Sequence, residues 1–207
     1  ENFSLPELLN LPFFSQMRTA YRRTIAAGWS PGMRNYITLL QYLSEINEHN
    51  PQHAKSYSKR FRSAGSDKHN SEAIFAELIV YHYYIRPYIE GLILGIELDA
   101  KEADVIVVRQ DGSKSYLEVF CIMPDFMDPP DSGEIITGEV KTHTQNAFSS
   151  IRQKLLRKIK KQKQMRALRD NYAVIELNDH LIANDFTVLS SLSSGYKLHI
   201  DANTNKI

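Results

Sequence analysis

Apolar residues recur at the spacing of an α-helix through the N-terminal quarter of the chain. Leucines follow Pro6 in one short group, a second row runs through Met17, Tyr21 and Ile25, and a third covers residues 33–46. Side chains three or four positions apart share one face of a helix. The pattern therefore predicts three helices that each bury one side.

A polar and basic stretch follows at residues 53–70, where lysines and arginines surround a Ser-Ala-Gly-Ser sequence. This composition is typical of an exposed loop, and we interpret it as a connector. Asn50-Pro51 ends the preceding helix, because the residue before a proline avoids helical geometry. The chain is thus predicted to divide into an N-terminal helical region with its basic connector, residues 1–65, and a second part, residues 66–207.

The pattern becomes clearer from Ser71 onward. Ser71 is a good helix N-cap, and the apolar row after it predicts a helix that ends before Pro87. Apolar runs then predict strands, and Asp111-Gly112 between two of them is a strong signal for a hairpin turn. A long loop precedes a basic helix at residues 151–170. The strands are expected at residues 92–98, 103–108, 116–122 and 172–177.

The predicted order after the N-terminal region is helix, strand, strand, strand, helix, strand. The compact arrangement for this order is a mixed sheet with helices packed against it, so the expected fold class is α/β.

The composition is that of an ordinary globular protein, with 43% hydrophobic and 24% charged residues. No stretch approaches the ~20 apolar residues that span a bilayer, and no signal peptide is visible. The single cysteine, Cys121, cannot form an internal disulfide, which agrees with a reducing compartment. We therefore expect a cytoplasmic protein without membrane contacts.

The net charge is only +1, but the charges are unevenly distributed. Residues 151–170 carry nine bases and one acid, a local charge of +8, which leaves −7 for the rest of the chain. Concentrated positive charge is typical of a polyanion-binding surface. A solvated helix face has the same composition, so charge alone leaves both interpretations open.

Two acidic residues stand inside otherwise apolar strands, Asp104 in residues 103–108 and Glu118 in residues 116–122. A carboxylate in such a place is costly unless it is paired, hydrogen-bonded or bound to a cation. If the predicted turn makes these strands a hairpin, both acids can project from one face and share Mg²⁺ or Mn²⁺, hard ions that favour oxygen ligands. The alternative is that Glu118 faces solvent on a half-exposed strand.

A helix with an internal acid, Glu77, is followed by the strands of Asp104 and Glu118 and by a basic helix. This succession, over about residues 71–177, resembles the PD-(D/E)xK, or restriction-endonuclease-like, nuclease superfamily. The resemblance implies that fold, with Asp104 and Glu118 as metal ligands, the carbonyl group of Val119 as a further ligand, and Glu77 as an accessory acid. Many members cut as dimers, so the resemblance also leaves a homodimer open.

Two positions depart from the superfamily's pattern. Ala103 replaces the proline that usually precedes Asp104, and Phe120 replaces a lysine that, in the superfamily, orients the attacking water. Lys154 and Lys158 share one side of the basic helix and are the candidate replacements. Glutamines of this helix, Gln153 and Gln162, are further candidates, and nucleic-acid contacts are expected from Arg157, Lys158, Lys161 and Gln162. A phosphate contact or a solvated charge is the alternative for each of them taken singly.

The leading prediction is a metal-dependent nuclease that hydrolyses phosphodiester bonds in DNA. Because Phe120 stands in the lysine position, a catalytically inactive protein of the same fold, which binds nucleic acid or a partner protein, is the first alternative. An interaction module whose N-terminal helices recruit partners is the second.

Overall fold

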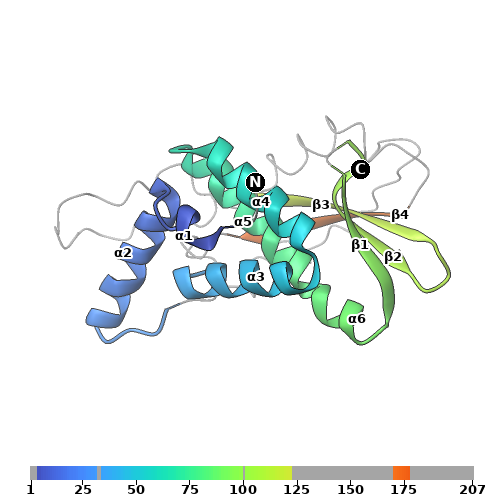
Figure 1. The fold of residues 1–207 in the computed structure, drawn as a ribbon, viewed down its shortest axis with the longest axis horizontal. Helices are drawn as coiled ribbons and strands as arrows, with labels where there is room; N and C mark the ends of the chain where they lie inside the picture. Colours follow the sequence, from blue (N-terminus) through green and yellow to red (C-terminus); the bar gives the residue numbers. More distant parts are fainter. Residues whose placement is uncertain (1–3, 32–33, 100, 123–169, 178–207) are drawn as a thin grey trace, which may run out of the picture. The chain divides into compact units, whose positions relative to one another are not determined.

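The computed structural model describes residues 4–31, 34–99, 101–122 and 170–177, which form a mixed α/β fold (Figure 1). Within these ranges, no helix combines the length and the apolar composition needed to cross a membrane. The helices are α1 (Leu5–Leu8), α2 (Pro12–Ala26), α3 (Tyr36–His49), α4 (Pro51–Ala64), α5 (Lys68–Tyr83) and α6 (Ile85–Ile89). The strands are β1 (Ile93–Asp99), β2 (Ala103–Arg109), β3 (Lys114–Ile122) and β4 (Asp170–Leu177).

The three helices predicted for the N-terminal region are present as α1, α2 and α3. Asn35 caps α3, and its side-chain oxygen accepts the main-chain N–H groups of Ile37 and Thr38 at 2.9 and 3.1 Å. These bonds satisfy two of the donors that a helix start leaves without partners. The apolar row of α3 is buried, as its spacing predicts, with Leu39 and Leu43 fully enclosed.

The basic stretch after α3 forms helix α4, so the prediction of an exposed connector is wrong. The side chain of Asn50 accepts the N–H of His53 at 3.2 Å. Pro51 occupies the first helical position, where its missing N–H costs nothing. The dipeptide that ends α3 therefore also starts α4. Apolar residues at helical spacing bury one side of α4, namely Ala54, Tyr57, Phe61 and Ala64.

Helix α5 begins one turn earlier than predicted, because Asp67 and not Ser71 is its N-cap. The side chain of Asp67 accepts the N–H of Asn70 at 3.0 Å, whereas Ser71 is buried within the helix. Burial extends around most of α5 and includes two acids, Glu72 and Glu77. Such a helix lies between other elements, and α5 is the central helix of the described fold.

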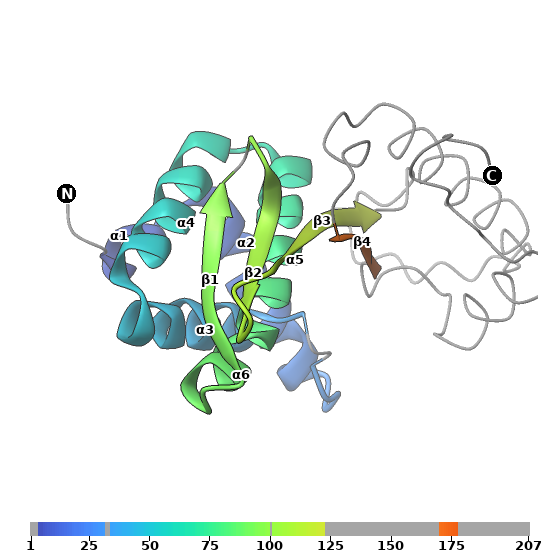
Figure 2. The ribbon, with the colours of Figure 1, turned by 90° about the vertical axis from the view of Figure 1, so that its right-hand side faces the viewer.

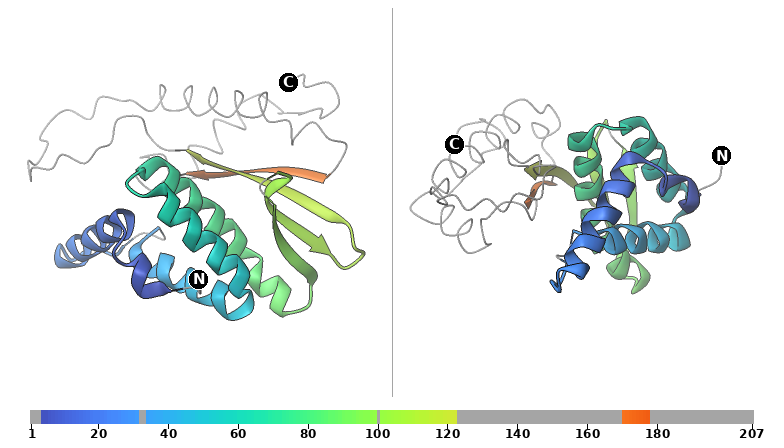
Figure 3. Two further views of the ribbon diagram at one scale, coloured as in Figure 1. Left: turned by 45° about the horizontal axis from the view of Figure 1, so that its top comes forward. Right: turned by 90° about the vertical axis from the view of Figure 1, so that its left-hand side faces the viewer.

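The four predicted strands are confirmed and form one sheet in the order β1, β2, β3, β4. β1 and β3 both run antiparallel to β2, whereas β4 runs in the direction of β3, so the sheet is mixed (Figure 3). The predicted turn between β2 and β3 is also confirmed. Gly112 adopts a φ of +79°, which glycine tolerates without strain, and Asp111 accepts the N–H of Ser113 at 2.9 Å.

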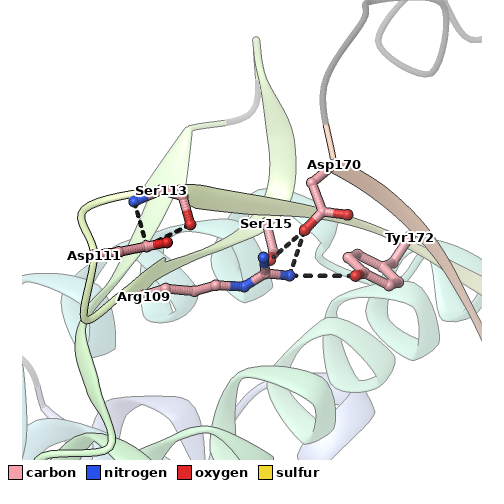
Figure 4. Close-up of polar contacts among 6 residues, drawn as sticks. All are labelled: Arg109, Asp111, Ser113, Ser115, Asp170 and Tyr172. Carbon is pink, nitrogen blue, oxygen red and sulfur yellow. Dashed lines mark hydrogen bonds and ion pairs between the residues drawn. The ribbon is translucent and has the colours of Figure 1, made fainter.

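Polar contacts hold β4 beside the hairpin of β2 and β3 (Figure 4). Arg109, at the end of β2, pairs with Asp170 and donates to the hydroxyl of Tyr172 at 3.2 Å. Ser115 of β3 donates to the same carboxylate of Asp170 at 3.0 Å. Residues far apart in the sequence therefore fix the register between the hairpin and the last described strand.

Helices α3, α4 and α5 cover one face of β1 and β2 (Figure 2). One apolar cluster joins the helices to this face of the sheet and includes Phe14, Tyr57, Phe75, Val105 and Leu117. This cluster contains residues of α1 to α4 as well as residues of α5 and the strands. The residues on the two sides of the expected boundary after residue 65 therefore share one core.

Candidate active site

Asp104 lies in a β-bulge of β2. Glu97 of β1 pairs with Ile106, and Asp99 pairs with Ala103. One residue of β1 therefore lies opposite two residues of β2, and Asp104 is one of these two. A bulge redirects side chains and interrupts regular pairing, and such bulges are frequent beside active sites.

The bulge stands where the hairpin opens. The ladder between β2 and β3 ends at the pair of Val105 and Leu117, after which β3 diverges from β2 (Figure 2). At this point Oδ2 of Asp104 accepts the main-chain N–H of Val119 at 2.8 Å. The carboxylate of Asp104 is thereby fixed at the residue that follows Glu118.

Glu118 is only 2% exposed, which excludes the alternative that it faces solvent. Side chains alternate along a strand, and Leu117 and Val119 belong to the core on the helix-covered face. Glu118 and Phe120 therefore share the other face of β3. Phe120 is 1% exposed and occupies the position where the resemblance predicts a lysine, so β3 itself provides no cation beside Glu118.

Glu77 of α5 is buried and pairs with Arg60 of α4. Nη2 of Arg60 donates to Oε1 of Glu77 at 2.6 Å, and Nη1 donates to Oε2, so one guanidinium engages both carboxylate oxygens. Burial of Arg60 disfavours its charge, but the hydrogen bond and the charge of Glu77 outweigh this effect, so the pKa of Arg60 is raised. As long as this pair is intact, both carboxylate oxygens of Glu77 accept hydrogen bonds from Arg60.

Tyr57 lies on α4, one turn before Arg60, and the charges of both this pair and Asp104 of the sheet influence its pKa. Its side chain is fully buried, and its hydroxyl lies 3.5 Å from the main-chain oxygen of Glu77. Burial, and then the charge of Glu77, raise the pKa of Tyr57 well above its ordinary value of 10.0. The charge of Asp104 raises the pKa of both Tyr57 and Arg60. Acids of α5 and β2 thus act on the same two residues of α4.

The acids singled out by the sequence have different partners in the structure. Asp104 reaches the main chain of β3, whereas Glu77 is held by Arg60. In the described part of the chain, no group of three carboxylate, histidine or cysteine side chains is placed to hold a metal ion. The candidate site therefore consists of Asp104 and Glu118 at the hairpin opening, with the Arg60–Glu77 pair in electrostatic reach of Asp104.

The site predictions for the expected basic helix at residues 151–170 fall on positions outside the described residues. They concern the candidate catalytic residues and the nucleic-acid contacts, namely Gln153, Lys154, Arg157, Lys158, Lys161 and Gln162. All of them remain predictions.

Sequence reasoning missed Arg60 as a member of the site, because residues 53–70 were interpreted as a connector. A signal was present in the spacing of Ala54, Tyr57 and Phe61, which places apolar residues along one side of a helix. Recognition of that helix would have placed Arg60 next to its buried face, although not beside Glu77.

No family model matches the chain, and no curated protein or solved structure shows significant similarity to it.

Proposed function

We propose that the protein is a metal-dependent nuclease that hydrolyses phosphodiester bonds in DNA. One observation carries this proposal: the carboxylate of Asp104, on a bulge of β2, accepts the N–H of Val119 where the hairpin opens, directly after the buried Glu118. The element order supports it further, because α5 and then β1, β2, β3 and β4 follow one another as the resemblance to PD-(D/E)xK nucleases implies, with the short α6 between α5 and β1; the helix expected before β4 lies outside the described residues.

The donor chemistry at the hairpin opening suits Mg²⁺ or Mn²⁺. Asp104 and Glu118 offer carboxylate oxygens, and Val119, whose N–H bonds to Asp104, also has a main-chain carbonyl oxygen that could serve as a ligand. Mg²⁺ is usually held by one or two carboxylates and keeps several waters or substrate phosphates as its other ligands, so a third acidic side chain is not required. When bound, the ion would polarise a phosphoryl oxygen and lower the pKa of a coordinated water.

The protein's own residues supply positioning and charge. The N–H of Val119 orients the carboxylate of Asp104, and Arg60 brings positive charge near Asp104. The transition state for phosphoryl transfer gains negative charge that a cation can stabilise. Because Phe120 cannot do this, we assign the role to Lys154 or Lys158, in the segment that the sequence predicts to be a basic helix.

Plasmid nicking in Mg²⁺ or Mn²⁺ tests the assignment. Asp104→Asn retains an oxygen that can accept the N–H of Val119 but removes the negative charge. Glu118→Gln removes the negative charge of the acid on β3 and keeps the size of its side chain. Each should lower the nicking rate about 100-fold or more. Glu97→Gln is the matched control, because Glu97 is a more exposed acid of the same sheet that pairs with Lys114, and it should leave the rate unchanged. Equal nicking by all four proteins would reject the assignment.

The second candidate function is that of a catalytically inactive nuclease-fold protein that binds nucleic acid. The complete burial of Phe120 in the lysine position favours it. It predicts no heat of Mg²⁺ binding in calorimetry, together with DNA affinity that falls with salt and is lost when Lys158 and Lys161 are neutralised. Metal binding that Glu118→Gln abolishes would decide against it.

A further inference from the structure

A hollow of about 330 Å³ lies between α4 and α5, and neither Asp104 nor Glu118 lines it. Helix α4 lines it with residues at helical spacing, which form a continuous row along one side. Helix α5 contributes Asn70 and Ile74, and Ile74 is buried. The residues of α4 are Ser56, Lys59, Arg60 and Ser63.

The lining carries two positive charges and no acidic residue. Lys59 is exposed and forms no ion pair with any described residue. The hydroxyls of Ser56 and Ser63 and the side-chain amide of Asn70 likewise donate no hydrogen bond to any residue that the structure describes. Neutral donors around two cations suit an oxyanion, because hydrogen bonds to a charged acceptor are the strongest.

Arg60 belongs both to this hollow and to the candidate active site. Its guanidinium pairs with Glu77, which lies one turn beyond Ile74 on α5, and its pKa responds to the charge of Asp104. Glu77 compensates much of the charge of Arg60, so Lys59 is the cation of the hollow that is available to a ligand.

From this arrangement we infer that the hollow between α4 and α5 binds a phosphate group of a nucleic-acid backbone. Lys59 supplies the charge, and Ser56, Ser63 and Asn70 supply hydrogen bonds. The choice of a nucleic acid rests on the proposed function, since inorganic phosphate presents the same oxyanion. A strand held here passes Arg60, the residue that joins the hollow to the site at Asp104.

Fluorescence anisotropy with a short labelled DNA duplex, in EDTA so that no cleavage occurs, tests this inference. Lys59→Gln should bind several-fold more weakly, and the slope of log K against log salt should fall by about 0.9, the contribution of one phosphate contact. The control is Arg86→Gln. Arg86 is an exposed base of α6, beyond the far end of α5 from Asn70, and its loss removes the same charge without changing affinity or slope. Equal melting temperatures show that both variants fold.

Unchanged affinity and slope in Lys59→Gln would overturn the inference, as would a wild-type protein that does not bind the duplex. Inorganic phosphate gives a further arm. If phosphate raises the melting temperature of the wild type but not of Lys59→Gln, while both bind DNA equally, the hollow takes free phosphate and the nucleic-acid assignment fails.

Plasmid cleavage in Mg²⁺, measured separately, distinguishes this inference from the proposed function. A Lys59 effect on binding without any cleavage supports the hollow and rejects the nuclease. Cleavage without a Lys59 effect rejects the hollow and supports the nuclease.

Discussion

Two arginine–carboxylate pairs, one in the helical layer and one at the sheet, show how the same chemistry serves different purposes. In the pair of Arg60 and Glu77, the carboxylate side chain is only 8% exposed. In the pair of Arg109 and Asp170, the side chains are 46% and 38% exposed. A buried carboxylate needs its partner to offset the loss of hydration, whereas water screens an exposed pair. The first pair should therefore matter for stability and for the candidate site, and the second mainly for the position of β4.

In a third arginine–carboxylate pair both side chains are buried, and its loss should have the largest effect on the free energy of unfolding. Arg34 and Glu72 are 5% and 7% exposed, and the guanidinium of Arg34 lies 4.6 Å from the ring centre of Phe75. Arg34→Ala leaves a buried carboxylate without this partner and should lower the free energy of unfolding by about 3–5 kcal/mol. Urea denaturation followed by circular dichroism measures the loss.

The control for this prediction is the double variant Arg34→Met, Glu72→Leu. Replacement of a buried ion pair by apolar residues of similar volume is often neutral or stabilising, so the double variant should recover most of the lost stability. If Arg34→Ala were as stable as the wild type, this buried pair would contribute no more to the free energy of unfolding than the exposed pairs do.

The pair of Arg60 and Glu77 should have an intermediate effect on stability. Glu77→Gln keeps the shape of the side chain but removes the charge-assisted hydrogen bonds, and we expect a loss of about 1–3 kcal/mol. Arg60 is partly exposed and can turn to water, which limits the loss. A double-mutant cycle with Arg60→Gln, measured by urea denaturation, isolates the coupling between the two residues. A coupling energy of zero would place this pair with the exposed ones.

The elements that sequence reasoning found are those whose signals are local. The strands follow from apolar runs, and the hairpin follows from Asp111-Gly112. Helix α4 was missed because Asn50-Pro51 can both end one helix and start the next, and the stop was given priority. The bulge at Asp104 depends on pairing between strands, and no pattern within β2 reveals an extra residue. Likewise, the partnership of Arg60 with Glu77 depends on the packing of α4 against α5.

A half-exposed pair in the helical layer should contribute to stability in a way that depends on pH. Glu45 of α3 pairs with His82 of α5, and the ring of Tyr42 stacks on His82 at 3.7 Å between centres. The hydrogen bond with His82 lowers the pKa of Glu45 below its ordinary value of 4.5. Because the folded-state pKa is lowered, the stabilisation is present above pH 4.5 and is lost as the pH falls through the folded-state pKa.

Thermal melts of the wild type and Glu45→Gln across this pH range measure the contribution. At neutral pH the wild type should be more stable by less than about 1 kcal/mol, because the pair is exposed to solvent. The difference should close below pH 4.5. Other acids titrate in both proteins, so the comparison isolates Glu45. A difference that persists undiminished well below pH 4.5 would contradict the assignment of the lowered pKa.

The smallest effect on overall stability is expected for Arg109→Ala, which also sharpens the comparison most directly. Arg109 lies at the surface, so its loss should leave the urea midpoint within error of the wild type. Yet Arg109 contacts both Asp170 and Tyr172, so β4 loses two of its contacts with the hairpin. Hydrogen exchange should accelerate in the amides of β4 and remain unchanged in α5, since local opening can occur far below the cost of global unfolding. Uniform acceleration in α5 and β4 would mean that this exposed pair, like the buried ones, supports the whole fold.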